Sequence, residues 1–289
     1  MASTSLEQGS RDVSGMRLLL LYVLCFALVV FYVNMFQFWA WVSRELGPGF
    51  LRNALPIIVT VSVLAVISLR FISRVNRGYR ISLLFLGLGI VGTFLALAIP
   101  DPRYPIKRIH VAEYIILSFL VRYTLSHRLQ GAVLTLFTIL TTLLFGVHDE
   151  MLQGLHSLRY YGWRDIIVNG TAGLSGALLG HGLFCCERFV GSGKADAPGW
   201  KDSLPLLGLY ILLFAAVGWQ AASLFGQRGE QISYLSLLPL TGVSLAIFVF
   251  YPGVALDSRR QHGLQAVLWL AVTLLVYPLL ANFAGLEFI

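Results

Sequence analysis

Nine apolar runs, each about as long as a bilayer-crossing helix, dominate the chain. They cover residues 18–41, 54–73, 81–99, 109–126, 130–147, 166–184, 204–225, 233–252 and 264–285. A transmembrane helix needs roughly 20 such residues, and a helix satisfies its own backbone polar groups, as lipid requires. Charged types supply only 12% of the chain, about half the share in soluble domains. The sequence therefore predicts an all-α, polytopic membrane helix bundle with about nine transmembrane helices.

The runs divide the chain into five predicted parts. Residues 1–15 are polar and rich in serine, which is typical of a disordered tail. Residues 16–79 hold two N-terminal transmembrane helices, 80–190 a helical core, 191–203 a cytoplasmic linker and 204–289 three C-terminal transmembrane helices. The first run is too long for a signal peptide and no A-x-A cleavage site follows it, so we expect it to be retained.

The basic loops predict the orientation of the bundle. The densest cluster of arginines is RFISRVNRGYR at residues 70–80, and Lys and Arg are enriched in cytoplasmic loops. We therefore place this loop and the N-terminus in the cytoplasm, which puts segments 100–108 and 148–165 on the outer side. Loop cations account for the formal net charge of +7, so we expect no nucleic-acid partner.

A polar stretch, HDEMLQGLHSLRYYGWRDIIVNGTAG, occupies residues 148–173 between two apolar runs. Ionisable groups at membrane depth are costly, and by default they indicate a functional site. We expect Asp149, Glu150 and Gln153 to lie together on a turn. Adjacent carboxylates on such a turn point in different directions, so each should have its own partners.

A second polar group precedes the fourth predicted helix. Lys107, His110 and Tyr114 follow i, i+3, i+7 spacing and share a helix face, which Glu113 borders. Because both polar segments lie on the outer side, we expect them to meet at one depth. One carboxylate of the polar stretch would then pair with Arg159, and the other with Lys107 or His110.

The candidate site combines acid–base groups with cations. Glu150 would be a general base, His110 its acid or base partner and Asp149 a second carboxylate. The other candidate ligand-binding residues are Lys107, Glu113, Tyr114, Gln153, Arg159, Asp165 and Asn169. An arginine flanked by aromatic residues can clamp a phosphate or carboxylate. The same residues would equally form a buried ion-pair network that fixes helix packing, and the sequence leaves both interpretations open.

The helix after the polar stretch begins with Asp165 and Asn169 and continues with a stripe of Gly173, Gly176 and Gly180. The GALLG segment is a GxxxG pattern, which lets another helix approach closely. An aspartate at this place can also cap the helix. We therefore expect a structural glycine stripe below two polar residues that face the site.

Metal-ligating types of side chain gather in the same region: His110, Glu113, His148, Asp149, Glu150 and His156. Their spacing matches no fixed signature such as HExxH, and the three cysteines form no CxxC pair. We expect no metal and no other cofactor, and we expect His148 and His156 to lie at the membrane interface.

With these residues in view, the region of about 80–190 resembles the VanZ-like membrane proteins. Lys107, His110 and Tyr114 resemble the family's K-x-x-H element with its aromatic residue, and D-E-x-x-Q occurs at 149–153. An R-x5-D spacing and a D-x3-N-x3-G helix opening follow at 159–173. Two departures stand out: Ile106 replaces an aspartate that often precedes the lysine, and Glu113 occupies a usually apolar position.

The resemblance implies a multi-pass protein of a prokaryotic plasma membrane, with a link to resistance against the lipoglycopeptide teicoplanin. Two hypotheses follow. In the first, the outward-facing site binds or handles an amphiphilic cell-envelope molecule, a membrane lipid or a lipid-linked one, with Arg159 and Lys107 taking its anionic group. In the second, the protein is an intramembrane enzyme that acts on a lipid-linked substrate by acid–base chemistry. Whether the protein is an enzyme and whether it oligomerises are left open.

Overall fold

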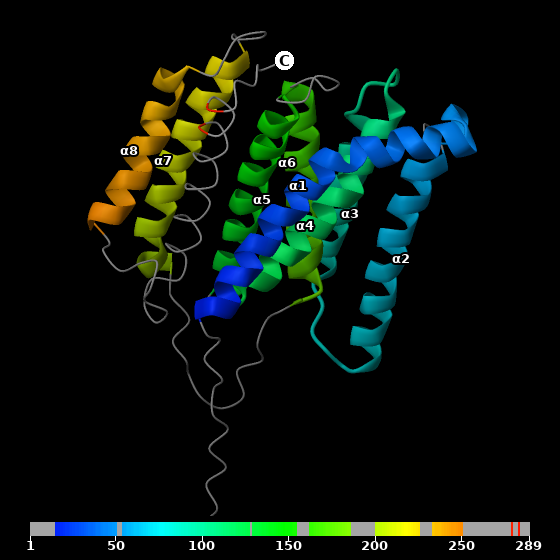
Figure 1. Ribbon diagram of the computed structural model, residues 1–289. Coiled ribbons are helices and arrows are strands. Elements are labelled where there is room, and N and C mark those ends of the chain that lie inside the picture. The colour runs from blue at the N-terminus through cyan, green and yellow to red at the C-terminus, as the bar shows by residue number, and fades with distance from the viewer. Residues whose placement is uncertain are drawn as a thin grey trace, which may run out of the picture.

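The computed structural model describes residues 15–50, 54–127, 129–154, 162–185, 200–225 and 233–250, together with Leu279 and Phe283. These residues form a helical bundle, and no strand occurs among them (Figure 1). The elements are α1 (Gly15–Leu46), α2 (Leu55–Asn76), α3 (Leu83–Ala98), the 3-10 helix η2 (Pro105–Arg108), α4 (Ile109–Leu125), α5 (Gly131–Gln153), α6 (Trp163–Gly182), α7 (Trp200–Phe225) and α8 (Tyr234–Phe250). The predicted all-helical class is confirmed.

Among the described residues, three helical stretches are long and apolar enough to cross a membrane: Leu55–Asn76, Gly131–Gln153 and Leu204–Phe225. A fourth is added if Leu20–Met35 and Phe38–Leu46, which are bent by 42° within α1, form one span. The predicted number of nine is not confirmed. The helix α4 has only 17 residues and α6 is rich in glycine and polar residues, while the tail up to residue 14 and nearly all of the run 264–285 lie outside the described residues.

The apolar outer surfaces agree with a membrane location. Large apolar side chains are exposed along α2 and α3, among them Val61, Leu69, Leu84 and Phe94. In water, an apolar surface of this extent would be covered by a partner. In lipid it needs no cover, because the acyl chains are themselves apolar.

Helix α5 extends further than the sequence predicted. The apolar run was expected to end at residue 147, but α5 continues to Gln153. Asp149, Glu150 and Gln153 share its last turns, as their i, i+3 and i, i+4 spacing predicted. The segment from 148 to 153 contains no Gly or Pro to break the helix, and the helix ends at Gly154. The carboxylates are therefore positioned by a rigid helix. Similarly, residues 200–203 of the predicted linker belong to α7.

Helix α6 lies at the centre of the bundle and packs against α3, α4 and α5 (Figure 1). A Cβ atom added to Gly176 would lie 2.7 Å from Cβ of Ser118 and 3.0 Å from the backbone oxygen of Ile115, both on α4. On the other side, Gly89 of α3 leaves room for Leu179 of α6. The close helix approach expected from the GxxxG pattern is thus observed.

The remaining helices surround this centre. Helix α1 contacts α4 and α5 and crosses the bundle obliquely, α7 packs between α5 and α8, and α2 contacts α4 on the other side (Figure 1). The chain between α3 and α4, which includes η2, meets the start of α6 at one end of the bundle. That end, where α4 begins, α5 ends and α6 begins, collects the polar side chains.

We predict that Gly176→Ala destabilises the protein, because the new methyl group meets the α4 backbone, which cannot move aside as a flexible side chain would. Overpacking of this kind costs about 1–3 kcal/mol, so the thermal unfolding midpoint in detergent should fall by several degrees. The matched control is Gly208→Ala on α7, where a Cβ meets nothing within 4 Å. An equal loss in both variants would contradict the packing argument.

Candidate functional site

Polar side chains from α4, α5 and α6 are buried together at the end of the bundle where α6 begins, and Lys107 of η2 lies at their rim. We call the following residues the polar cluster: Lys107 from η2, His110, Glu113 and Tyr114 from α4, Asp149, Glu150 and Gln153 from α5, and Asp165 and Asn169 from α6. The two polar segments that the sequence placed on one side therefore do converge. Their roles as catalytic or ligand-binding residues stay predictions.

Asp149 is completely buried between two neutral donors. The hydroxyl of Tyr114 donates to Oδ2 of Asp149 over 2.9 Å, and the amide nitrogen of Asn169 donates to the same oxygen over 3.3 Å. Gly146, one turn earlier on α5, makes this approach possible, because a Cβ there would lie 3.0 Å from Cβ of Asn169. Three helices thus meet on a single carboxylate oxygen.

Two acceptor atoms beside this contact meet no donor from the described residues. These buried atoms are Oδ1 of Asp149 and Oδ1 of Asn169. A buried acceptor in this state costs about 1–3 kcal/mol. These oxygens are therefore places where a ligand hydroxyl, a ligand amine or a water molecule would be stabilised.

Glu150 turns away from Asp149 and has different donors, as the sequence predicted for adjacent carboxylates. The amide nitrogen of Gln153 donates to its Oε1 over 3.1 Å, and the backbone N–H of Gly162 donates to its Oε2 over 3.3 Å. The second bond joins the end of α5 to the residue that precedes α6. Asp149, Asp165, His110 and Lys107 also lie within the range of charge–charge interaction with Glu150.

Lys107 forms an ion pair with Asp165. The Lys107 side chain is 36% exposed, whereas that of Asp165 is 5% exposed, so the ammonium group lies at the rim and the carboxylate inside. Asp165 was also expected to cap α6, but the cap position is Gly162 and no side-chain cap bond forms. In the first turn of α6, the carboxylate instead lies near the positive end of the helix dipole.

The predicted pairing of Lys107 or His110 with Asp149 or Glu150 is wrong. Lys107 forms its ion pair with Asp165. Nδ1 of His110 lies 2.8 Å from Oε2 of Glu113, three residues later on the same helix. The reason is local: i, i+3 spacing on α4 brings the imidazole and its carboxylate together without any contribution from α5. In addition, Tyr32 of α1 donates to the backbone oxygen of Glu113 over 3.1 Å.

Two further expectations have different outcomes. His148 was expected at the interface, but it is completely buried, and its ring centroid lies 5.2 Å from that of Phe26 on α1. The interfacial placement was wrong for His148 because α5 continues as a helix past this point, under the cover of α1. Arg159 and His156 lie outside the described residues, so the pairing proposed for Arg159 stays a prediction.

The loop before α4 is fastened to the start of α6. Nε of Arg164 donates to the backbone oxygen of Ile99 over 2.6 Å, and its Nη1 lies 3.4 Å from the carboxylate of Asp101. Nε of Arg108 donates to the backbone oxygen of Leu97 over 3.2 Å. These bonds hold the segment that carries Lys107 over the first turn of α6.

One buried cation was not singled out from the sequence. Arg122 near the end of α4 is completely buried, and its Nε donates to the backbone oxygen of Cys185 over 2.9 Å. Its Nη1 donates to Oγ1 of Thr135 over 3.1 Å. Gly180 makes room, since a Cβ there would lie 2.7 Å from Cδ of Arg122. The glycine stripe was the available signal, because its last member faces this arginine.

No group of three or more His, Cys, Asp or Glu side chains in the described part of the chain is arranged to hold a metal ion. The carboxylates of the polar cluster instead rely on hydrogen-bond donors and on Lys107. The carboxyl and amide oxygens of the cluster can accept hydrogen bonds from a polar molecule. The partly exposed ammonium group of Lys107 can interact with an anion.

Comparisons of the chain with protein-family models, with curated proteins and with solved structures find no match. The resemblance to the VanZ-like proteins therefore stays a prediction from the motifs alone.

We predict an asymmetry between the two members of the Lys107–Asp165 pair. Lys107→Met leaves a carboxylate buried without its cation, whereas Asp165→Asn leaves an ammonium group that is already 36% exposed and can reach water. The thermal unfolding midpoint should therefore fall further in Lys107→Met than in Asp165→Asn.

The double variant Lys107→Met/Asp165→Asn is the control for this asymmetry. It should recover most of the loss seen in Lys107→Met, because no uncompensated charge remains. A double variant as unstable as the sum of both single variants would show that the pair is not coupled.

Proposed function

We propose that this is an integral membrane protein of VanZ-like type whose polar cluster binds the polar head of an amphiphilic cell-envelope molecule. The observation that carries the proposal is a pair of buried acceptors, Oδ1 of Asp149 and Oδ1 of Asn169, that no donor of the described residues reaches. A head group with hydroxyl or amine donors would satisfy both oxygens and recover the free energy that their burial costs.

The charge distribution supports an amphiphile that also carries an anionic group. Lys107 uses its ammonium group for Asp165 but remains 36% exposed at the rim, and it lies 6.0 Å from the ring centroid of Tyr104. An ammonium group in this position can hold a phosphate or carboxylate of the ligand while the ligand's donors reach inward. The apolar part of the ligand would stay in the bilayer.

The resemblance and the loop charges complete the proposal. We place the protein in the plasma membrane of a prokaryote with the polar cluster toward the outer leaflet, where lipids and lipid-linked envelope precursors are met. A link to teicoplanin resistance is part of the same proposal, because that drug acts at this surface and carries a lipid tail.

The proposal is tested by mass spectrometry of the amphiphiles that remain bound to the full chain after purification in mild detergent. The wild type should retain one class of anionic amphiphile with donor groups. Lys107→Met should retain about tenfold less, since a charge-assisted hydrogen bond contributes roughly 1.5–3 kcal/mol.

Arg103→Met is the matched control, because Arg103 is an exposed cation in the same loop. It should retain as much amphiphile as the wild type. The proposal fails if no amphiphile is retained above the level of bulk lipid, or if both variants lose it equally.

A second candidate function is acid–base catalysis on a lipid-linked substrate. The observation that favours it is the oriented His110–Glu113 pair at 2.8 Å, which lies in the electrostatic field of Asp149 and Glu150. An imidazole held by a carboxylate is a common acid–base element.

This candidate predicts turnover of lipid-linked envelope precursors by the purified protein, and loss of that turnover in Glu150→Gln with the thermal unfolding midpoint retained. Unchanged turnover in Glu150→Gln would exclude Glu150 as the general base. Retention of an amphiphile without any chemical change would favour the binding function.

A further inference from the structure

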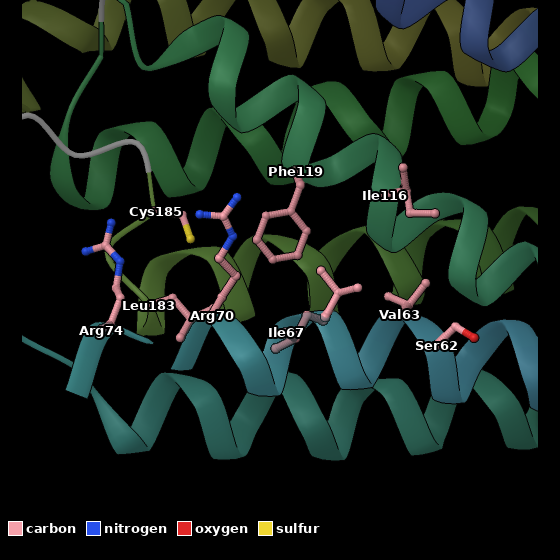
Figure 2. A pocket seen from close by; sticks show the side chains of 10 residues that line it. Ser62, Val63, Ile67, Arg70, Arg74, Ile116, Phe119, Leu183 and Cys185 are labelled. Carbon is pink, nitrogen blue, oxygen red and sulfur yellow. The ribbon is translucent and has the colours of Figure 1, made fainter. Parts of the chain in front are cut away.

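A groove lies between α2 and α4, toward the end of the bundle opposite the polar cluster (Figure 2). Its volume of about 630 Å³ lies within the range of about 300–1,000 Å³ that is usual for small-molecule sites. Most of its lining is apolar and comes from Val63, Val66, Ile67, Ile116, Phe119 and Leu183. The groove therefore suits a hydrocarbon chain.

The groove has one basic end. Arg70 and Arg74 lie side by side at this end, next to Cys185, and Ser62 lies at the other end (Figure 2). Ser62 and Arg74 are separated along α2 by about 18 Å at 1.5 Å per residue. That length is slightly more than half of a hydrocarbon core of roughly 30 Å, so the groove matches the depth of one leaflet with the arginines at head-group level.

Among the residues that the structure describes, Arg74 has no anionic partner. Its Nη1 is buried without a hydrogen-bond partner, and its guanidinium carbon lies 5.0 Å from the ring centroid of Tyr79. The aromatic ring holds the guanidinium in place but supplies no negative charge. Guanidinium groups bind phosphate through two parallel hydrogen bonds, so a phosphate at this end would satisfy the buried nitrogen.

The surroundings identify where the occupant comes from. Helix α2 is one of the candidate spans, and large apolar side chains are exposed along it, which suits contact with lipid. We propose that the groove binds an anionic phospholipid, with an acyl chain along α2 and its phosphate held by Arg70 and Arg74. Basic pockets between transmembrane helices on the cytoplasmic side are known to hold anionic lipid head groups. Residues 70–80, which comprise the end of α2 and the chain after it, carry the basic cluster that the sequence places in the cytoplasm.

The test is native mass spectrometry of the full chain, titrated separately with phosphatidylglycerol and with zwitterionic phosphatidylcholine. The wild type should bind phosphatidylglycerol more tightly. In Arg70→Gln/Arg74→Gln, binding of phosphatidylglycerol should fall about tenfold or more. Binding of phosphatidylcholine should fall less, because its choline already offsets the phosphate charge, so the preference for phosphatidylglycerol should disappear. Val66→Trp, at a side chain that is 58% exposed, fills the groove without disturbing the core and should weaken the binding of both lipids.

Arg77→Gln/Arg80→Gln is the matched control, because it removes the same charge from exposed arginines of the same loop that do not line the groove. It should bind phosphatidylglycerol as the wild type does. An equal loss in this control would reduce the effect to general surface charge and overturn the proposal, as would equal affinity of the wild type for both lipids. A dimer that disappears in Val66→Trp would assign the groove to a second copy of the chain instead. Thermal unfolding of each variant checks its fold.

Discussion

Close packing of α6 against three neighbours is the constraint on which the rest of the structure depends. Helices in lipid gain little from apolar contacts, because lipid is as apolar as their own side chains. Association must come from tight van der Waals contact and from hydrogen bonds between helices. Gly176 and Gly180 provide the first by admitting Ser118 and Arg122 of α4. The hydroxyl of Ser118 adds the second, since it donates to the backbone oxygen of Gly173 over 3.0 Å.

The same closeness makes the polar cluster possible. Asp149 can accept from Tyr114 and Asn169 at once only because Gly146 lets α4 and α6 approach α5. In the part of the chain that the structure describes, the acidic side chains of the cluster outnumber its cations, and the two carboxylates of α5 are held by neutral donors. Neutral donors orient a carboxyl group without forming an ion pair with it, so the group can still interact with a ligand.

The two ends of the α4–α6 unit carry buried groups of opposite charge type. At one end, carboxylates are buried and Lys107 lies at the rim. At the other end, Arg122 is buried and gives its hydrogen bonds to Cys185 and Thr135, while Arg70 and Arg74 line an apolar groove. An arrangement of this kind suits a protein that meets a different polar molecule at each face of a membrane. One proposal places an amphiphile at the first end and the other places an anionic phospholipid at the second. They rest on different residues, so each can be tested without the other.

The sequence by itself determined the helical class, the approximate helices from 54 to 184 and the meeting of the Lys107 segment with the Asp165 segment. These follow from the length of the apolar runs and from the fact that successive loops lie on alternate sides of the membrane. Both can be read directly from the order of residues along the chain. Only the tertiary structure decided that Lys107 pairs with Asp165, that Asn169 and Tyr114 donate to the same oxygen of Asp149, and that Arg122 is buried. These pairings depend on which side chains three converging helices bring within 3–4 Å of one another. That in turn depends on how each helix is rotated about its axis, which residue spacing along the chain does not specify.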